Sequence, residues 1–260
     1  MTSKLMEIKG LTIKDQSGAV LVDNVSVGLN DKEFVGIVGE SGSGKSLTTQ
    51  ALLNVLPKSL QAEYEQLTLM DRSVEGMDAA QIRALVGREI GFVPQNTVSF
   101  LHPLIKIKHQ IGDAYMHHMK KSREAAYDKA CRLLSKVGIK DPDRVMNSYP
   151  FQISGGMKQR VNIALALMTD PKVIIADEPT TALDTVIQRQ VMDLFDTMNR
   201  QEGVPILFIS HDLNIIRRYC SRVYVMYKGK LVESGSTELV FSQPEHPYTR
   251  QLLDSTMTIK

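Results

Sequence analysis

The sequence contains little cysteine and almost no excess charge of either sign. Its two cysteines, Cys131 and Cys220, lie far apart and form no CxxC pair. This disfavours a disulfide framework or a zinc knuckle and suits a reducing cytosol. The 31 Lys and Arg residues nearly balance the 29 Asp and Glu residues, which gives a net charge of +2. Because so small a charge creates no broad positive field, we expect neither a nucleic-acid partner nor direct binding to a membrane surface.

The sequence also lacks long apolar segments. The longest apolar runs, such as residues 163–168 and 173–176, fall far short of the roughly 20 residues that cross a bilayer. Residues 1–7 lack the apolar run of a secretory signal. We therefore expect a soluble intracellular protein, whose role at a membrane, if it has one, depends on a partner.

The composition and the hydrophobic pattern predict a globular α/β protein. Of its 260 residues, 43% are hydrophobic and 23% are charged, which excludes disordered and fibrous classes. Short strands are predicted over residues 5–9, 11–14 and 20–29, followed by a buried strand over 34–38. Other strands are predicted over residues 90–93, 173–176, 206–209 and 223–227, the last paired with 230–233. Helices are predicted over residues 47–56, 78–86, 185–200 and 213–219.

A mostly helical stretch interrupts this α/β pattern. Residues 104–137 have apolar positions at helical spacing, and Ser154 is predicted to cap a helix that runs to residue 168. We find no internal repeat and no low-complexity segment. The stretch from about 96 to 168 is therefore expected to be inserted within the α/β domain.

A glycine-rich loop follows the buried strand and precedes a predicted helix. It matches the pattern G-x-x-x-x-G-K-[ST] with Gly39, Glu40, Ser41, Gly42, Ser43, Gly44, Lys45 and Ser46. Backbone N–H groups of such a loop surround phosphates, while Lys45 reaches the β- and γ-phosphates and Ser46 ligates Mg²⁺. An ordinary glycine–serine turn matches this pattern by chance in roughly one chain of this length in a hundred. We therefore predict a nucleotide site.

A second apolar strand ends in two carboxylates. Asp177 at its tip is suited to holding the water shell of Mg²⁺, and Glu178 to orienting and polarising an attacking water. Without other motifs, such a pattern usually marks a strand that enters a solvated turn. Because the glycine-rich loop precedes it in this chain, the functional interpretation is favoured. Lys45 and Asp177 are 132 positions apart, which agrees with an inserted subdomain.

The segment Ser154-Gly155-Gly156-Met157 lies at the predicted start of a helix. It offers a hydroxyl and uncovered N–H groups, as a second anion site would. In isolation, an ordinary helix cap is the better interpretation. Because Asp177 follows Met157 by only 20 residues, the anion site is favoured here.

Together these segments resemble the nucleotide-binding subunit of an ATP-binding-cassette (ABC) transporter over essentially the whole chain. Residues 39–46 match the Walker A loop of that family, and residues 154–157 match its signature, with Met157 where glutamine is commoner. Asp177 and Glu178 match Walker B and the catalytic glutamate. The other matches are Gln95 with the Q-loop glutamine, residues 182–184 with the D-loop, and His211 with the switch histidine.

The resemblance implies an α/β fold of the P-loop NTPase type. The expected ABC cassette has a RecA-like core, an N-terminal antiparallel β subdomain and an inserted α-helical subdomain. We expect one domain over residues 1–260, with its core at 1–95 and 169–260 and the helical subdomain at about 96–168.

The resemblance also implies the roles of single residues. ATP and Mg²⁺ are expected between two cassettes packed head to tail. The expected metal ligands are Ser46, Gln95 and Asp177, and the residues expected to take part in hydrolysis are Lys45, Gln95, Glu178 and His211. Ser154, Gly155, Gly156 and Met157 are expected to contact the nucleotide of the partner cassette, and Asp184 to bridge the two subunits.

The sequence departs from the family pattern at one point. The family usually stacks adenine on an early aromatic side chain, near the position of Asp15. No aromatic residue precedes Phe34 in this chain. We therefore expect either that an aliphatic residue packs against the adenine or that the selectivity or affinity for the base is weaker.

Within the family, the chain is most similar to importers of peptides and nickel. The similarity lies in residues 148–154, 175–184 and 243–253. Many peptide-importer subunits continue into a cysteine-bearing extension, whereas this sequence has no cysteine after Cys220. It therefore resembles the shorter nickel or metallophore (opine) type more. His102, His109, His117 and His118 have irregular spacing, so we expect a solvated or interface role rather than a metal site.

The expected partners are a second ABC ATPase subunit, identical or different, and two membrane-spanning permease subunits. An extracytoplasmic solute-binding protein is expected to act indirectly. The expected location is the cytoplasmic face of the cell membrane, reached through the permeases. Two alternatives are a soluble ABC ATPase of DNA repair or translation and a module that binds ATP without hydrolysing it. Tandem cassettes, coiled-coil arms or basic extensions would favour the first, and missing catalytic residues the second.

Overall fold

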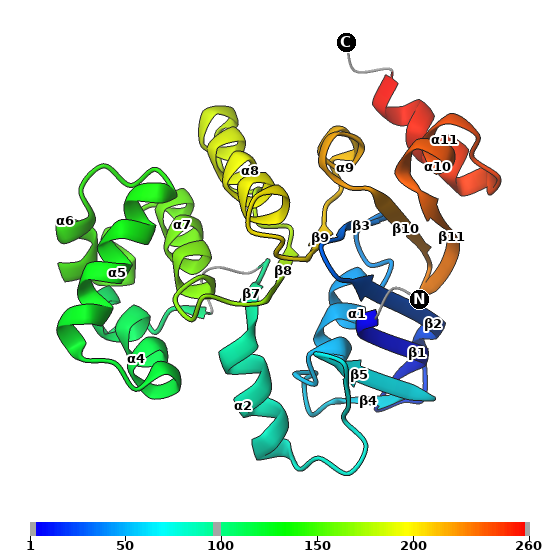
Figure 1. Ribbon diagram of the computed structural model, residues 1–260. Helices are drawn as coiled ribbons and strands as arrows, with labels where there is room; N and C mark the ends of the chain where they lie inside the picture. Colours follow the sequence, from blue (N-terminus) through cyan, green and yellow to red (C-terminus); the bar gives the residue numbers. More distant parts are fainter. Residues whose placement is uncertain (1–3, 96–99, 258–260) are drawn as a thin grey trace. The chain divides into compact units, whose positions relative to one another are not determined.

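The computed structural model describes residues 4–95 and 100–257, with the side chains of 114, 256 and 257 left out. The chain forms two compact units (Figure 1). One unit consists of Met1–Asp78 and Pro205–Lys260, and the other of Ala79–Val204. None of the described helices has the length and apolar character needed to cross a membrane.

The first unit begins with an antiparallel sheet. Strands β1 (Lys4–Asp15) and β2 (Val20–Asn30) form a long hairpin. The two strands predicted over 5–9 and 11–14 are one strand, whose register shifts around Gly10 at φ +60°. The sheet order is β2-β1-β5-β6, and β4 also pairs with β1. The added strands are β4 (Leu60–Glu63), β5 (Gln66–Leu69) and β6 (Arg72–Ser73), which the sequence pattern did not predict.

The first unit also contains a group of strands in the order β11-β10-β3-β9. Strands β3 (Phe34–Val38), β9 (Ile206–Ile209) and β10 (Arg222–Tyr227) are parallel, and β11 (Lys230–Ser236) is antiparallel to β10. Every residue of β3 and β9 is buried, as expected for strands covered on both faces. The helices of this unit are α1 (Lys45–Leu52), α9 (Leu213–Tyr219), α10 (Thr237–Ser242) and α11 (Pro247–Met257).

The second unit contains the parallel pair β7 (Ile90–Val93) and β8 (Val173–Asp177) and most of the helices. The helices are α2 (Ala79–Glu89), α4 (Ile107–Met119), α5 (Arg123–Lys136), α6 (Pro142–Asn147), α7 (Gly155–Ala166) and α8 (Thr185–Arg200), with a 3₁₀ turn at Pro150–Gln152. Helices α4, α5 and α7 pack against one another. Helix α8 buries Val191, Met192, Phe195 and Met198, which recur at helical spacing on one face.

The predicted elements agree best where the sequence has clear start and stop residues. The bounds predicted for residues 90–93, 185–200, 206–209 and 213–219 are those observed. The helix predicted over 47–56 begins at Lys45 and ends at Leu52, because the chain turns at Asn54 with φ +56°. The helical stretch over 104–137 is divided at Lys120, which has φ +54° and separates α4 from α5.

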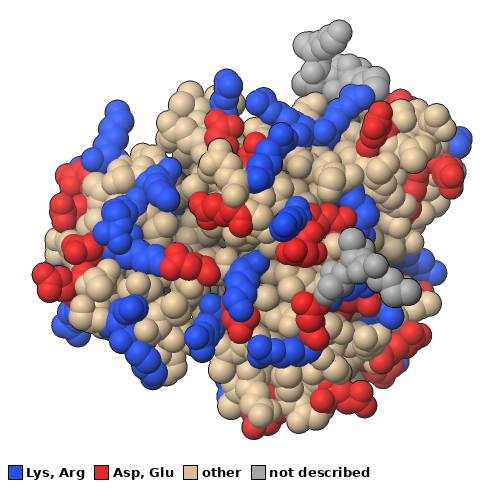
Figure 2. All heavy atoms as spheres, viewed as in Figure 1, with Lys and Arg blue, Asp and Glu red and all other residues tan. Residues whose placement is uncertain are grey.

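Acidic and basic side chains are mixed on the surface. On the face shown in Figure 2, the two signs alternate, and neither forms one continuous region. This agrees with the near balance of 31 basic and 29 acidic residues.

Within the first unit, a network centred on Arg222 joins sequence-distant strands. Its guanidinium donates to both carboxylate oxygens of Glu33, at 2.6 and 2.7 Å, and to the Gly28 carbonyl oxygen at 2.8 Å. Tyr224 adds a hydrogen bond from its hydroxyl to the same Gly28 carbonyl. Burial raises the pKa of Glu33, but the hydrogen bonds from Arg222 and Asn30 outweigh this effect and lower it below its ordinary value.

We predict that Arg222→Met lowers the stability of the protein by about 2 kcal/mol at pH 7, because it leaves the Glu33 carboxylate without its bidentate partner. The lowered pKa of Glu33 means that this contribution is present above pH 4.5 and is lost as the pH falls further. The difference between wild type and variant should therefore shrink in acid. Urea unfolding followed by circular dichroism measures both effects.

The matched control is Arg200→Met, which removes the ion pair between Arg200 and Asp196 on α8. The Arg200 side chain is 68% exposed. An exposed pair of this kind contributes about 0.5 kcal/mol or less. Equal losses in the two variants would contradict the structural importance of the Arg222 network.

Candidate functional site

The glycine-rich loop connects β3 with α1 in the first unit. Gly39 is buried at φ +152°, and a Cβ there would overlap the carbonyl oxygen of Met226 at the end of β10. Gly44, at φ +99°, is the N-cap of α1, and its Cβ would lie 3.0 Å from Val22. The close packing of the loop on β10 and β2 therefore requires glycine at both positions.

Lys45 lies against the backbone of this loop. It is only 5% exposed, and its Nζ donates to the carbonyl oxygens of Gly39 at 2.9 Å and Glu40 at 2.8 Å. The hydroxyl of Ser43 is buried and has no hydrogen-bond partner among the described residues. An ammonium, an unsatisfied hydroxyl and the N-terminus of α1 fit the chemistry of a phosphate group. Ser46, one residue further on, is half-buried in the first turn of α1.

His211 belongs to the same unit as the loop. It is exposed and follows β9, whereas the loop follows β3. Because β3 and β9 are parallel neighbours, His211 and the loop lie at the same edge of these strands. The next residue, Asp212, caps α9 by accepting a hydrogen bond from the backbone N–H of Asn214.

Asp177 and Glu178 belong to the second unit. All five residues of β8 are buried, and Asp177 at its end is 2% exposed. Glu178 has φ +46°, a conformation that costs free energy and is often found at functional sites. The hydroxyl of Thr181 donates to the Glu178 carboxylate at 3.2 Å and to its carbonyl oxygen at 3.3 Å. Thr181 therefore holds the side chain that the sequence predicts to be the catalytic carboxylate.

Gln95 follows a strand that neighbours the one before these carboxylates. It follows β7, the parallel neighbour of β8, so Gln95, Asp177 and Glu178 lie at the same edge of the pair. Its side chain is exposed. The residues directly after it, 96–99, lie outside the described part of the chain.

The segment Ser154–Met157 begins helix α7. Ser154 caps the helix as predicted, and its Oγ accepts a hydrogen bond from the Met157 backbone N–H at 3.3 Å. A Cβ on Gly156 would lie 3.2 Å from the carbonyl oxygen of Ala182, whereas Gly155 faces open space. The segment therefore lies against residues that closely follow Asp177 and Glu178.

Gln159 makes a second connection between these segments. It is 1% exposed and lies in α7, and its Nε2 donates to the Pro179 carbonyl oxygen at 2.7 Å. The sequence pattern alone assigns no role to Gln159 or Thr181, although both lie in or directly beside segments that resemble the family. Their importance follows from contacts that no local pattern reveals.

Asp184 has a local role in the structure. Its carboxylate accepts a hydrogen bond from the Ile187 backbone N–H at 3.0 Å and so caps α8. The side chain is exposed. The bridging role expected for Asp184 stays a prediction beside this observed capping role.

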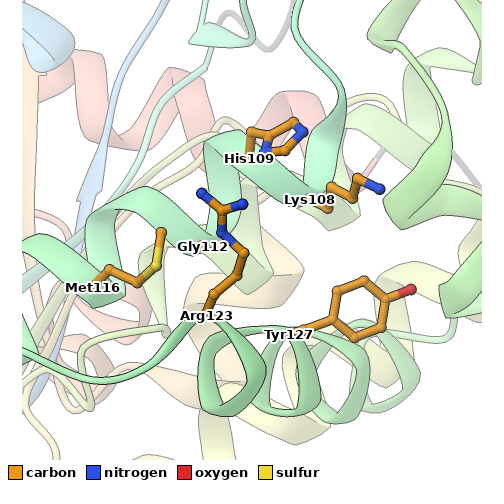
Figure 3. Close-up of a pocket in the computed structure, with 6 residues that line it drawn as sticks. All are labelled: Lys108, His109, Gly112, Met116, Arg123 and Tyr127. Atoms are coloured by element: carbon orange, nitrogen blue, oxygen red, sulfur yellow. The ribbon is translucent and has the colours of Figure 1, made fainter.

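The histidines of the second unit lie on or beside helix α4. His109 lines a cavity of about 190 Å³ between α4 and α5, together with Lys108, Gly112, Met116, Arg123 and Tyr127 (Figure 3). Two cationic side chains beside His109 oppose the binding of a metal cation there. Burial, followed by the charges of His117 and Lys120, lowers the pKa of His118. Among the described residues, no group of three or more His, Cys, Asp or Glu side chains could hold a metal ion.

Both cysteines are free thiols in the described part of the chain. Burial raises the pKa of Cys220 far above its ordinary value and also raises that of Cys131. These thiols are therefore protonated at neutral pH and have little nucleophilic character.

Comparison with known proteins identifies the family. The family described as ABC transporter matches residues 22–181 of this chain. This range contains the glycine-rich loop, the Ser154–Met157 segment and the carboxylates of Asp177 and Glu178. The chain belongs to the ABC transporter family. The family expected from the sequence is therefore confirmed.

Individual relatives agree over most of this ABC cassette. It is 39% identical to the oligopeptide transport ATP-binding protein OppD of Bacillus subtilis, over 99% of this chain and 73% of that protein. It is 41% identical to the peptidoglycan transport ATP-binding protein YejF of Agrobacterium fabrum, over 97% of this chain. The chain spans only 47% of the length of YejF.

A solved structure confirms the fold class. The cassette resembles the dimeric, post-hydrolysis structure of the ATP-binding cassette MJ0796 bound to ADP and Pi, with a TM-score of 0.80. The sequences are 27% identical, and the match covers 89% of this chain and 98% of that chain. The predicted α/β ABC fold is therefore confirmed.

We predict that Gly39→Ala destabilises the first unit more than Gly42→Ala does. Both positions have positive φ, but only a Cβ at Gly39 would overlap another group, the Met226 carbonyl oxygen. Gly42 faces open space, so its substitution should cost only the backbone strain of about 1 kcal/mol. Thermal unfolding without nucleotide measures the difference, and equal melting temperatures would show that the loop does not need its close approach to β10.

Proposed function

We propose that this chain binds MgATP, hydrolyses it, and powers the import of peptides through separate permease subunits. The observation that carries the proposal is the buried Lys45 ammonium within a loop of glycine backbone, in a chain that also holds a constrained Glu178 after a buried strand. Its membership of the ABC transporter family supports the same function.

The phosphates bind to the loop of the first unit. Backbone N–H groups and the N-terminal end of α1 stabilise their negative charge, and Lys45 provides the full positive charge. Its Nζ now contacts the Gly39 and Glu40 carbonyl oxygens, so it is placed at the loop without a long reorientation. Ser46, Gln95 and Asp177 are the ligands that we propose for Mg²⁺, and a bound Mg²⁺ would neutralise part of the phosphate charge.

Hydrolysis requires an oriented water. Glu178 accepts its proton as a general base, and the Thr181 hydroxyl keeps the carboxylate in one orientation. His211, at the edge where the phosphate loop also lies, is proposed to contact the γ-phosphate.

A second cassette completes the catalytic unit. Ser154, Gly155, Gly156 and Met157 form an exposed to half-buried helix start, and they are proposed to bind the nucleotide held by the other cassette. The dimeric form of MJ0796 supports this arrangement. We propose that Asp184 contacts the partner, that the helices of the second unit transmit closure to two permeases, and that these hold the chain at the cytoplasmic face of the membrane.

Peptides are the substrate class that the relatives favour. Relatives at about 40% identity are named for oligopeptide and peptidoglycan transport. Import of nickel or metal–opine complexes stays a narrower prediction from the sequence. The cargo is delivered by an extracytoplasmic binding protein and does not contact this chain, so its residues contain no cargo site.

We predict that Glu178→Gln lowers the ATP turnover rate at least about 100-fold while nucleotide binding is retained, because it removes the proton acceptor and keeps the shape. Bound ATP should then accumulate in a stable dimer, visible by size-exclusion chromatography with MgATP. The matched control is Glu202→Gln, an exposed position of the same unit, which should turn over ATP at the wild-type rate. Unchanged turnover in Glu178→Gln would contradict the assigned mechanism.

We predict that vesicles containing this chain with its permeases, the second ATPase and the binding protein take up oligopeptides when ATP is supplied on the cytoplasmic side. Uptake should be compared for labelled oligopeptides, free nickel and a nickel–opine complex. Glu178→Gln should abolish uptake of the true cargo. Uptake of nickel alone would overturn the peptide proposal and leave the ATPase proposal in place.

A further inference from the structure

A side chain from the C-terminal helix contacts the backbone of the phosphate loop. The backbone N–H of Glu40 donates to the hydroxyl oxygen of Tyr248 at 2.9 Å, across a sequence separation of 208 residues. Tyr248 belongs to α11 and is 5% exposed. Both residues belong to the first unit, so the contact lies within one compact body.

The hydrogen bond to Tyr248 involves the Gly39–Glu40 peptide group, which also binds Lys45. The carbonyl oxygen of Gly39 accepts from Lys45 Nζ at 2.9 Å, and the N–H of that peptide, on Glu40, donates to Tyr248. In a planar trans peptide these two groups point in opposite directions. Two partners on opposite sides therefore fix the rotation of the Gly39–Glu40 peptide, and any flip would lose both hydrogen bonds.

Tyr248 is itself held from two sides. Its ring stacks on Tyr227 of β10, with 4.1 Å between ring centroids and an interplanar angle of 25°. The Glu233 carboxylate of β11 accepts from the backbone N–H groups of Glu245 at 2.9 Å and His246 at 3.0 Å. The start of α11 is thus attached to the two strands whose connecting turn also reaches the loop, because Gly229 N–H donates to the Ser43 carbonyl oxygen.

The protonation states support a stable arrangement. Burial raises the pKa of the Tyr248 phenol, so the hydroxyl stays neutral at physiological pH and accepts the hydrogen bond without an added charge in the loop. Burial also raises the pKa of Glu233, but hydrogen bonds such as those from the backbone N–H groups of Glu245 and His246 outweigh this and lower it. The carboxylate that anchors α11 is therefore ionised at neutral pH.

We propose that Tyr248 is a positioning residue of the phosphate loop, which sets nucleotide affinity by fixing the Gly39–Glu40 peptide and, through its carbonyl oxygen, Lys45. The inference rests on the proposed nucleotide site. It makes the segment around residues 244–250 part of the ATP-binding machinery, although Tyr248 itself touches the loop backbone and not the phosphates.

The test compares Tyr248→Phe with Tyr227→Phe in the full chain. Both substitutions remove one hydroxyl and keep the stacked rings, but the Tyr227 hydroxyl makes no hydrogen bond to the described residues. The Kd for MgADP, measured by isothermal titration calorimetry, should rise about 3- to 10-fold in Tyr248→Phe, the effect of losing one hydrogen bond. The KM for MgATP should rise similarly while kcat stays unchanged, because hydrolysis at saturation uses the same catalytic groups. Tyr227→Phe should match wild type.

The outcomes separate this inference from the proposed function. Failure of the wild-type chain to bind MgADP would overturn the nucleotide site and this inference with it. Binding by wild type together with a Kd within twofold in Tyr248→Phe would overturn only the role of Tyr248. A fall in kcat at unchanged KM would also contradict it.

A second variant distinguishes an effect on nucleotide affinity from a general loss of stability. Thermal unfolding should place Tyr248→Phe within a few degrees of wild type. If its melting temperature is much lower, Glu233→Gln replaces it, since this change keeps Tyr248 and weakens only the anchor of α11. A raised Kd in that variant supports the inference, and an unchanged Kd overturns it.

Discussion

The first unit depends on one steric constraint, the close approach of the phosphate loop to the end of β10. A backbone without side chains is needed where Gly39 meets the Met226 carbonyl oxygen. The same constraint explains why the loop can present N–H groups, since side chains on its inner surface would fill the space that a phosphate needs. Lys45, directly after the loop, then returns to the Gly39 and Glu40 carbonyl oxygens instead of extending into solvent. The need for glycine at position 39 and the buried position of Lys45 therefore both depend on the packing of this loop.

In the second unit, the main constraint is the orientation of a carboxylate at the end of a strand. A buried strand fixes the position of Asp177, and the turn that follows has to leave the strand sharply, which places Glu178 at positive φ. Such a conformation persists only when neighbours stabilise it. Thr181 binds the Glu178 side chain and carbonyl, and Gln159 binds the next carbonyl, that of Pro179. Since Gln159 lies in the helix that begins with the Ser154–Met157 segment, movement of that segment is mechanically connected to the residue after Glu178.

The sequence predicted those parts of the molecule that depend on local patterns. The buried strands, the glycine-rich loop after β3 and the cap at Ser154 each follow from a few adjacent residues, and the structure has them where expected. The strands β4 to β6 escaped prediction because they are short and form only by pairing with β1 or with one another. The roles of Thr181, Gln159 and Tyr248 escaped it for a related reason. Each depends on a carbonyl, a carboxylate or an N–H group brought near by the fold, and a residue's own sequence neighbourhood does not reveal such a partner.

The helices between β7 and β8 have a small thermodynamic cost. The two strands pair although the end of β7 at Val93 and the start of β8 at Val173 are far apart in the sequence. The entropy of closing a flexible loop grows only logarithmically, by about 0.6 kcal/mol for each doubling of its length. An inserted segment that forms its own packed helices, as α4, α5 and α7 do, is not a flexible loop and costs still less. These helices can therefore form without weakening the strands on either side of them. The predicted site residues Gln95, Glu178 and His211 each follow the end of a strand, outside the inserted helices.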